Sequence, residues 1–444
     1  MTHRQAFPSR LAFGAIAIAA LLAGPASAQS LKELYEAARA YDATYLAARA
    51  QAQSAEFRAA QSEALARPVA NATAAATLAQ SDPPTGGSVT SRTAQAALSG
   101  RYPLINRAND VTIEQARRAL VAASAELEAA EQDLIVRVAQ AYFDVLGAQD
   151  TLANTRANKA AITEQLASAR RNFEVGTATI TDTREAQARF DLATAQEIAA
   201  DNDLRAKRIA LDQLVGRTGV VPRPLATPVT LPPVLPAAVD EWVESADRQH
   251  PTVRRAQVAA EVARLETDKA RAAEKPTLDA VGSLSLGDSR GSAFSSFARG
   301  TTTTGSVGVQ LTWPLYTGGA TQNRIRETLA LQDKAGNDLQ AARRGVAQGT
   351  RVAFFGVQSG QARVKALEAA EASSKLALEA TQLGFRVGVR VNLDVLNAQR
   401  DLFATQRDLA LARYEVIVGQ LRLRQASGQL GAGDVEAADR LLAR

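Results

Sequence analysis

The stretch FRVGVRVNLDVLNAQRDLF, residues 385–403, nearly repeats the stretch FEVGTATITDTREAQARFD, residues 173–191. Each copy has a Val-Gly pair with an aspartate six residues after the glycine: Val175, Gly176 and Asp182 in the first, Val387, Gly388 and Asp394 in the second. The two glycines are 388 − 176 = 212 residues apart. A repeat of this length exceeds a solenoid unit, so it indicates one structure written twice with the same turn in each half.

Other landmarks recur at nearly the same offset. Pro103, after Tyr102, corresponds to Pro314, after Trp313, at 314 − 103 = 211. A Pro-rich segment separates the halves and cannot form regular helix. We therefore divide the chain into a first repeat, a linker, a second repeat and a tail, at residues 29–219, 220–240, 241–427 and 428–444.

The N-terminus has the features of a secretory leader. Arg4 and Arg10 precede an apolar run over residues 11–23, and small residues follow as far as Ala28. This pattern predicts a Sec-type signal peptide, residues 1–28, cleaved after Ala28. A short membrane anchor is the alternative, although a spanning helix needs roughly 20 apolar residues. The chain has no cysteine and two histidines, which argues against disulfides, thiolate or multi-histidine metal sites, and metal cofactors.

Long stretches without proline predict helices. Residues 107–172 and 321–386 are expected to form two very long helices, and shorter ones are expected at 31–67, 181–216, 241–275 and 392–427. In the last of these, apolar residues recur every seventh position with small residues three positions later, as at Val395 with Ala398 and Val416 with Gly419. A seven-residue repeat produces left-handed coiled coils. An intracellular coiled-coil scaffold would share this pattern, but the leader argues against it.

Alternating apolar and polar residues predict four strands, near 69–80, 92–103, 277–287 and 303–314. Strands of about 10 residues with one apolar face suit a membrane-spanning barrel, whereas two half-buried soluble hairpins are the alternative. Tyr102 and Trp313 stand at strand ends, where an aromatic girdle would lie. Because an open sheet edge is not tolerated in lipid, several chains would have to share one barrel. Two chains would supply eight strands and three would supply twelve, and the strand pattern is compatible with either number.

These landmarks resemble the TolC family of outer-membrane efflux and secretion channels. The resemblance is carried by the two Val-Gly turns with their aspartates, by the Tyr-Pro and Trp-Pro joins at Pro103 and Pro314, and by the opening LKELYEAARAYDATYLAARAQ from Leu31. It implies a mainly α fold with a small β part: coiled-coil hairpins in two repeats, two transmembrane strands in each, and a homotrimer with a twelve-stranded outer-membrane barrel on a periplasmic tunnel. The linker would lie in an equatorial belt.

The resemblance also implies a gated tip at the two turns. It places Asp394 in a ring of three carboxylates at the pore constriction, and Asn397 where some members carry a second acid, so block by multivalent cations is expected to be weaker. Arg390 matches a gate-latching arginine whose partners would be Thr181 and Asp182. Phe385 stands where a tyrosine often strengthens this latch. The alternative interpretation is local: Asp182 and Asp394 would cap their helices, and Arg390 would be a solvated turn residue.

The implied function is a passive exit duct for efflux or type I secretion, opened by a periplasmic adaptor and an inner-membrane pump of RND or ABC type. An enzyme is not expected, because the chain has no nucleophile–base constellation and no Gly-rich phosphate loop. A nucleic-acid partner is not expected either, because the net charge of +5 is spread along the chain. A periplasmic adaptor protein with one helical hairpin is the alternative function.

Overall fold

The computed structural model describes residues 28–82, 84, 86–293 and 299–443, so the expected leader up to residue 27 lies outside the described chain. The chain forms two compact units, each of which draws on both sequence repeats. Among these described residues, unit 1 contains 28–46, 130–250 and 347–443. Unit 2 contains Ala47–Ala129 and Pro251–Val346.

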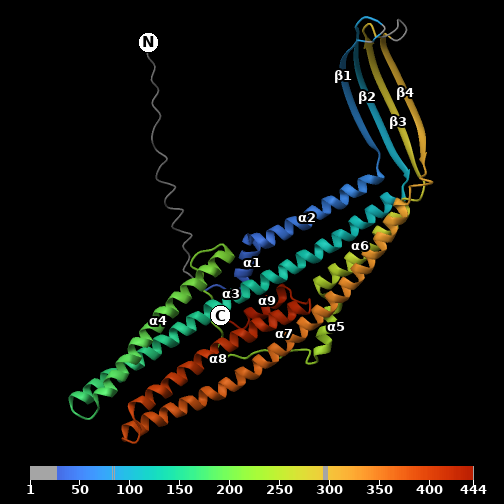
Figure 1. Cartoon of the computed structure of the whole chain (residues 1–444). Helices are drawn as coiled ribbons and strands as arrows, with labels where there is room; N and C mark the ends of the chain where they lie inside the picture. Colours follow the sequence, from blue (N-terminus) through green and yellow to red (C-terminus); the bar gives the residue numbers. More distant parts are fainter. Residues whose placement is uncertain (1–27, 83, 85, 294–298, 444) are drawn as a thin grey trace, which may run out of the picture. The chain divides into compact units, whose positions relative to one another are not determined.

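Helices and strands follow one another in nearly the same order in the two halves (Figure 1). In chain order they are α1 (Leu31–Tyr41), α2 (Ala43–Glu63), the 3₁₀ helix η1 (Ala64–Ala66), β1 (Val69–Ser81), β2 (Val89–Ile105), α3 (Arg107–Glu174), α4 (Ile180–Val215), α5 (Val239–Gln249), α6 (Pro251–Ala272), β3 (Thr277–Arg290), β4 (Gly300–Thr312), α7 (Ala320–Arg386), α8 (Asn392–Ala426) and α9 (Ala432–Asp439). The two very long helices and all four predicted strands are confirmed.

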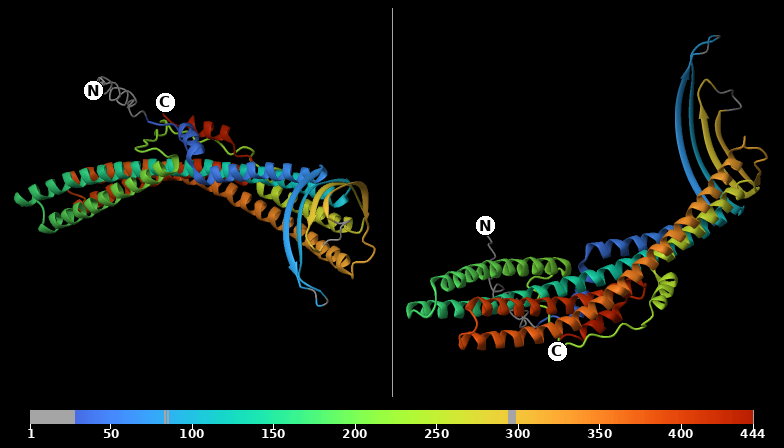
Figure 2. Two further views of the ribbon diagram at one scale, coloured as in Figure 1. Left: turned by 90° about the horizontal axis from the view of Figure 1, so that it is seen from above. Right: turned by 60° about the horizontal axis from the view of Figure 1, so that its bottom comes forward.

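The four strands of unit 2 form one open antiparallel sheet in the order β1-β2-β3-β4 (Figure 2). The register places the predicted apolar residues in common rows, such as Ala72, Leu98 and Leu284. The alternate residues form polar rows across all four strands, as Asn71, Ser99, Ser283 and Ser306 do. One face of the sheet is therefore apolar and the other is lined by small polar side chains, and the edges β1 and β4 have no strand partner within the described chain.

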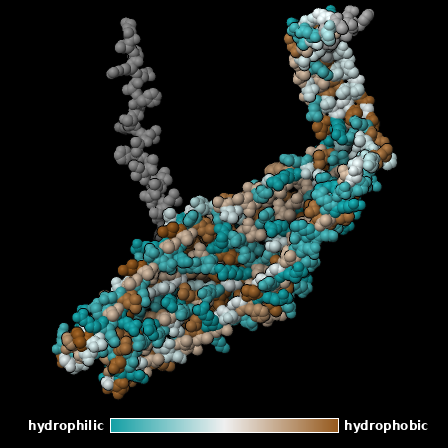
Figure 3. Space-filling model, viewed as in Figure 1, coloured by the Kyte–Doolittle hydropathy of each residue, from teal (hydrophilic) through white to brown (hydrophobic). Residues whose placement is uncertain are grey.

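Apolar side chains are exposed on the sheet and at its junctions with helices. Val307 and Leu311 are 95% and 64% exposed on β4, and Trp313 and Tyr316 are 58% and 89% exposed just beyond it. In Figure 3 the helical surfaces are largely hydrophilic, whereas hydrophobic side chains gather where the strands meet the helices. Exposure of this much apolar area on a sheet marks a surface that something else covers.

The seven-residue pattern of the last long helix forms the interior of unit 1. Its apolar residues within α8 are all buried, namely Val395, Leu402, Leu409, Val416 and Leu423, and so is Leu430 beyond the end of the helix. A Cβ at Gly419 would lie 3.3 Å from Val357 of α7, and one at Gly360 would lie 2.9 Å from Val416. These small residues let α7 and α8 approach closely, as the sequence pattern predicts for Gly419. Gly349 has no such neighbour within the described chain.

Two predicted helices are each split in two. The stretch 31–67 breaks at Asp42, which leaves the helical conformation and accepts a hydrogen bond from the Tyr45 N–H at 2.8 Å, so it caps α2. The stretch 241–275 breaks at His250, because Pro251 disfavours helical backbone in the residue before it. Helix α9 was not expected from the sequence. Its Asp439 accepts the Leu31 N–H at 2.8 Å and so caps α1.

Asp42 also fixes α1 and α2 to α3. The two Arg137 terminal nitrogens each donate to one Asp42 carboxylate oxygen at 3.0 Å, and the Asp42 side chain is only 10% exposed. The hydrogen bonds from Arg137 are the main reason why the pKa of Asp42 lies below its usual value of 3.8. Since the folded pKa is lowered, the pair stabilises the fold above the usual pKa and loses its contribution as pH falls through the folded value.

We expect Asp42→Asn to destabilise unit 1 by about 1–2 kcal/mol at neutral pH, because asparagine keeps the helix cap but loses the charge. The difference from wild type should shrink in acid, and thermal unfolding at the two pH values measures it. Asp133→Asn is the matched control, since Asp133 binds the same Arg137 at 2.6 Å but is 54% exposed. An equal effect of the two substitutions would show that the buried Asp42 pair contributes no more to stability than the exposed Asp133 pair.

Candidate functional site at the two hairpin turns

The two Val-Gly sequences form the same turn. In the first, the Thr177 N–H donates to the Asn172 carbonyl at 2.8 Å and Gly176 has a φ of 77°. In the second, the Val389 N–H donates to the Gly384 carbonyl at 2.9 Å and Gly388 has a φ of 83°. The left-handed backbone favours glycine, and the bond closes the helix end in a Schellman motif. Gly176 and Gly388 are therefore fixed by geometry at the ends of α3 and α7.

Each helix that follows a turn begins differently. The Thr179 hydroxyl accepts the Asp182 N–H at 3.2 Å, and the Thr179 N–H donates to the Asp182 carboxylate at 2.9 Å, which gives α4 a full capping box. At the start of α8, Val391 has no side-chain acceptor, and its N–H lies 3.4 Å from the Asp394 carboxylate. The second turn therefore has fewer capping hydrogen bonds than the first. Three valines around the two turns are exposed: Val175, Val387 and Val389.

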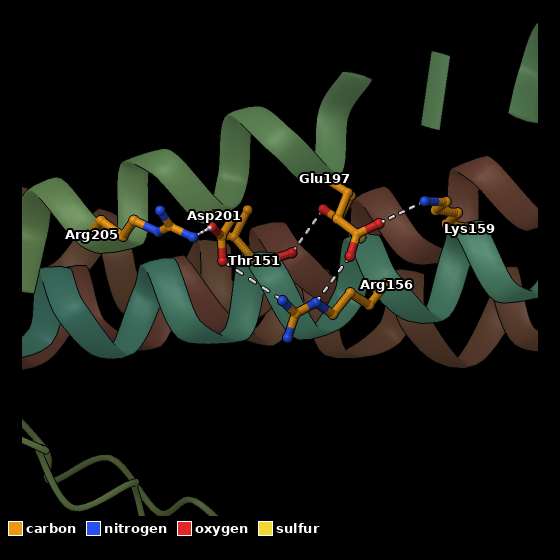
Figure 4. Close-up of polar contacts among 7 residues, drawn as sticks. Thr151, Arg156, Lys159, Glu197, Asp201 and Arg205 are labelled. Atoms are coloured by element: carbon orange, nitrogen blue, oxygen red, sulfur yellow. Dashed lines mark hydrogen bonds and ion pairs between the residues drawn. The ribbon is translucent and has the colours of Figure 1, made fainter. Parts of the chain in front are cut away.

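Charged side chains join α3 and α4, the two helices of the first hairpin (Figure 4). Glu197 of α4 accepts from Lys159 at 2.9 Å and from Arg156 at 3.1 Å, both on α3. Arg156 also lies 3.6 Å from Asp201, which pairs with Arg205 at 2.6 Å. Lys159, followed by Arg156, lowers the pKa of Glu197. The first hairpin is therefore joined by a partly exposed ion network.

The second hairpin is attached to α3 through a buried aromatic joint. The Tyr414 hydroxyl donates to Asp150 at 2.6 Å, and the Tyr414 ring packs against Phe143 with centroids 5.7 Å apart. Burial raises the pKa of Asp150 above its usual value, although the Tyr414 hydrogen bond opposes this. Next to the joint is a hollow of about 690 Å³ between α3, α4, α7 and α8, with Asp144, Lys207 and Arg422 among its lining residues.

Nearer the turns, α8 touches both helices of the first hairpin. Leu396 packs with Ile162 of α3 and Ala193 of α4 in a small buried cluster that Phe190 covers. Beside it, the Arg189 guanidinium donates to the Asn397 side-chain oxygen at 3.2 Å. These contacts bring the predicted constriction residue of one hairpin against the other hairpin. Both turns lie at the same end of unit 1 (Figure 2).

The predicted latch residues pair differently within one chain. The Arg390 guanidinium lies 3.7 Å from Asp394, and its side chain folds over Gly384, where a Cβ would come within 2.8 Å of Arg390. Asp182 binds Thr179 of its own cap. The structure therefore brings Arg390 to Asp394 and does not bring it to Thr181 or Asp182 of the same chain. Asp182 and Asp394 do serve their helix ends, as the local interpretation held.

The remaining predicted site residues lie at helix ends and strand ends. Phe385 is half-buried in the last turn of α7, and Thr181 is exposed. Pro103 lies inside β2, next to a bulge that ends the strand, and Pro314 follows β4 six residues before α7 begins at Ala320. The contact of Arg189 with Asn397 was not predicted, because nothing in the sequence distinguishes this arginine from the others on an Ala-rich helix. No group of three or more metal-ligating residues occurs among the residues described.

No helix in the described residues has both the length and the apolar character needed to cross a membrane. Two long hairpins with glycine turns, joined in a duplicated chain to an open four-stranded sheet, are the architecture of a TolC-type channel subunit. Residues 34–217 and 242–429 match the family model described as outer membrane efflux protein.

The chain is 33% identical over 409 residues to the outer membrane protein TolC of Vibrio cholerae, covering 92% of each protein. It is 34% identical over 307 residues to the alkaline protease secretion protein AprF of Pseudomonas aeruginosa, covering 69% of this chain and 63% of AprF. The fold superposes on a CusC crystal structure with a TM-score of 0.79 at 20% identity, over 91% of this chain and 93% of CusC. The chain belongs to the outer membrane efflux protein family.

Proposed function

We propose that three copies of this chain form a passive exit duct in the outer membrane, which serves efflux or type I secretion. The observation that carries the proposal is the open sheet of unit 2. Its apolar residues share one face, its small polar residues share the other, and its two edges have no strand partner in the described chain. Such a sheet suits lipid on one side and water on the other, provided that other copies complete it.

Three copies would give a twelve-stranded barrel with a lumen, whereas two would give eight strands, whose interior side chains fill. The exposed apolar residues of α4 and α7 support this assembly in unit 1. Ile198 and Ile209 are 67% and 66% exposed on α4, and Leu376 is 67% exposed on α7. These helices would be the edges through which each copy packs against the next, and their association would complete a helical tunnel.

The two turns would form the closed end of this tunnel. Three copies of Asp394 would make a ring of carboxylates that attracts cations, and Asn397 would add a neutral ring. Arg390 is proposed to latch this end on Thr181 and Asp182 of a neighbouring copy, in exchange for its 3.7 Å contact with Asp394. Phe385, without a hydroxyl, would leave that latch weaker.

The relatives suggest the partners and the cargo. AprF and PrtF carry protease secretion in their names, whereas BepC is named an outer membrane efflux protein. By analogy, this chain would receive cargo from a periplasmic adaptor and an inner-membrane pump of RND or ABC type. We also propose export by a leader, residues 1–28, cleaved after Ala28.

Reconstitution of the purified protein in planar bilayers tests the proposal. We expect a heat-resistant trimer in detergent and discrete single-channel currents, because an assembled barrel with a lumen conducts ions. A soluble, non-conducting protein would contradict the proposal and favour the adaptor alternative. Reconstitution of heat-denatured protein is the control for leaks caused by detergent.

A further inference from the structure

We infer that Arg189 is the residue that ties α8 to α4 near the hairpin turns and that its charge limits cation binding there. This inference rests on the proposed channel. Its geometric basis is the hydrogen bond of 3.2 Å from the Arg189 guanidinium to the Asn397 oxygen. Among the residues described, this is the one side-chain hydrogen bond between α4 and α8.

The position of Arg189 is set by its packed neighbours. Phe190, the next residue, covers the cluster of Ile162, Ala193 and Leu396, and Ala186, three residues earlier, is fully buried. Arg189 itself is half-buried, and its hydrogen bond to Asn397 directs its side chain across the α4–α8 contact. Asn397 directly follows Leu396 and Arg189 directly precedes Phe190, so packing of the apolar cluster brings the amide and the guanidinium to neighbouring positions on α8 and α4.

The charges around this contact give it a consequence for ion binding. Asp394, one turn before Asn397, lies near Arg390, and Asp401, one turn after it, pairs with Arg400 at 2.9 Å. Arg189 instead binds a neutral amide, so its positive charge is not cancelled there. An uncancelled guanidinium beside the constriction opposes the entry of multivalent cations. The weak cation block expected from Asn397 thus has a second cause, which lies on the other hairpin.

This arrangement predicts a specific non-additivity. In Asn397→Asp the new carboxylate would pair with Arg189, so block of single-channel current by hexamminecobalt(III) should tighten by less than about threefold. In the double variant Arg189→Gln, Asn397→Asp the same carboxylate would be free, and the block should tighten on the order of tenfold. A single variant that binds the cation as tightly as the double variant would overturn the inference.

The tie itself is tested by the conductance of the full-length protein in the absence of the blocker. Arg189→Gln should raise the mean single-channel conductance, and Arg189→Lys, which keeps a charged donor, should restore most of the wild-type value. Arg184→Gln is the matched control, because Arg184 is exposed on the same helix. An equal rise in Arg184→Gln would overturn the inference, and a wild-type protein that does not conduct would refute the channel itself.

Discussion

Leu284→Arg is expected to prevent assembly of the protein in the outer membrane. Leu284 lies in the middle of β3, on the apolar face and opposite Leu98, and is 48% exposed in the single chain. An arginine facing lipid near the bilayer midplane costs about 2–4 kcal/mol for each strand that carries it, and every copy in the barrel would carry one. Outer-membrane fractionation, followed by a test for the heat-resistant oligomer, measures the result.

Ser285→Arg supplies the matched control, because it adds the same side chain one residue further along the same strand. Ser285 lies opposite Ala97 and Thr304, on the face with small polar side chains. This variant should still assemble and should change only the conductance or the ion preference of the pore. If both variants assembled equally well, the apolar face of the sheet would not be in contact with lipid.

Asp394→Asn is expected to lower the ratio of cation to anion permeability on the order of fivefold, because three carboxylates at the constriction would become neutral. Asparagine retains an oxygen that can accept the Val391 N–H, so the start of α8 should be preserved. Reversal potentials in a salt gradient give the ratio directly.

Asp401→Asn is the control for a general loss of charge. Asp401 lies one heptad further along α8, is 61% exposed and pairs with Arg400. It should leave the permeability ratio nearly unchanged. A ratio that falls equally in both variants would mean that the selective ring is not formed by Asp394.

The parts of the fold that depend on local chemistry were predictable from the sequence. The doubled glycine turn followed from Gly176 and Gly388, whose left-handed backbone favours glycine. The sheet faces followed from strict alternation, because a register slip of one residue would reverse them. The split at Pro251 was also readable in principle, since a residue before proline disfavours helix. The split was not predicted, because the apolar pattern is long on both sides of Pro251.

Contacts between distant helices could not be predicted in this way. The pairing of Asp42 with Arg137 and of Arg189 with Asn397 depends on where separate helices cross. The same limit applies to Arg390. Sequence resemblance supplied its expected partners, but within one chain its guanidinium lies nearest Asp394 of its own turn. Side chains on Ala-rich helices carry little information about which neighbour they meet.

Disulfide formation between the sheet edges tests the central claim most directly. The natural chain has no cysteine, so a cysteine introduced on β1 and another on β4 are the only thiols. Within one chain these edges are separated by β2 and β3, about 14 Å in total, which is too far for a disulfide. A small panel can combine Thr73→Cys or Ala75→Cys with Thr302→Cys or Thr304→Cys.

We predict that oxidation in the membrane links chains edge to edge and that the largest covalent product contains three chains. Each single substitution serves as the control and should give no more than occasional dimers. A barrel shared by three chains would be contradicted if the correctly folded double variants gave no bond between chains. It would also be contradicted if the linked products stopped at two chains or continued beyond three.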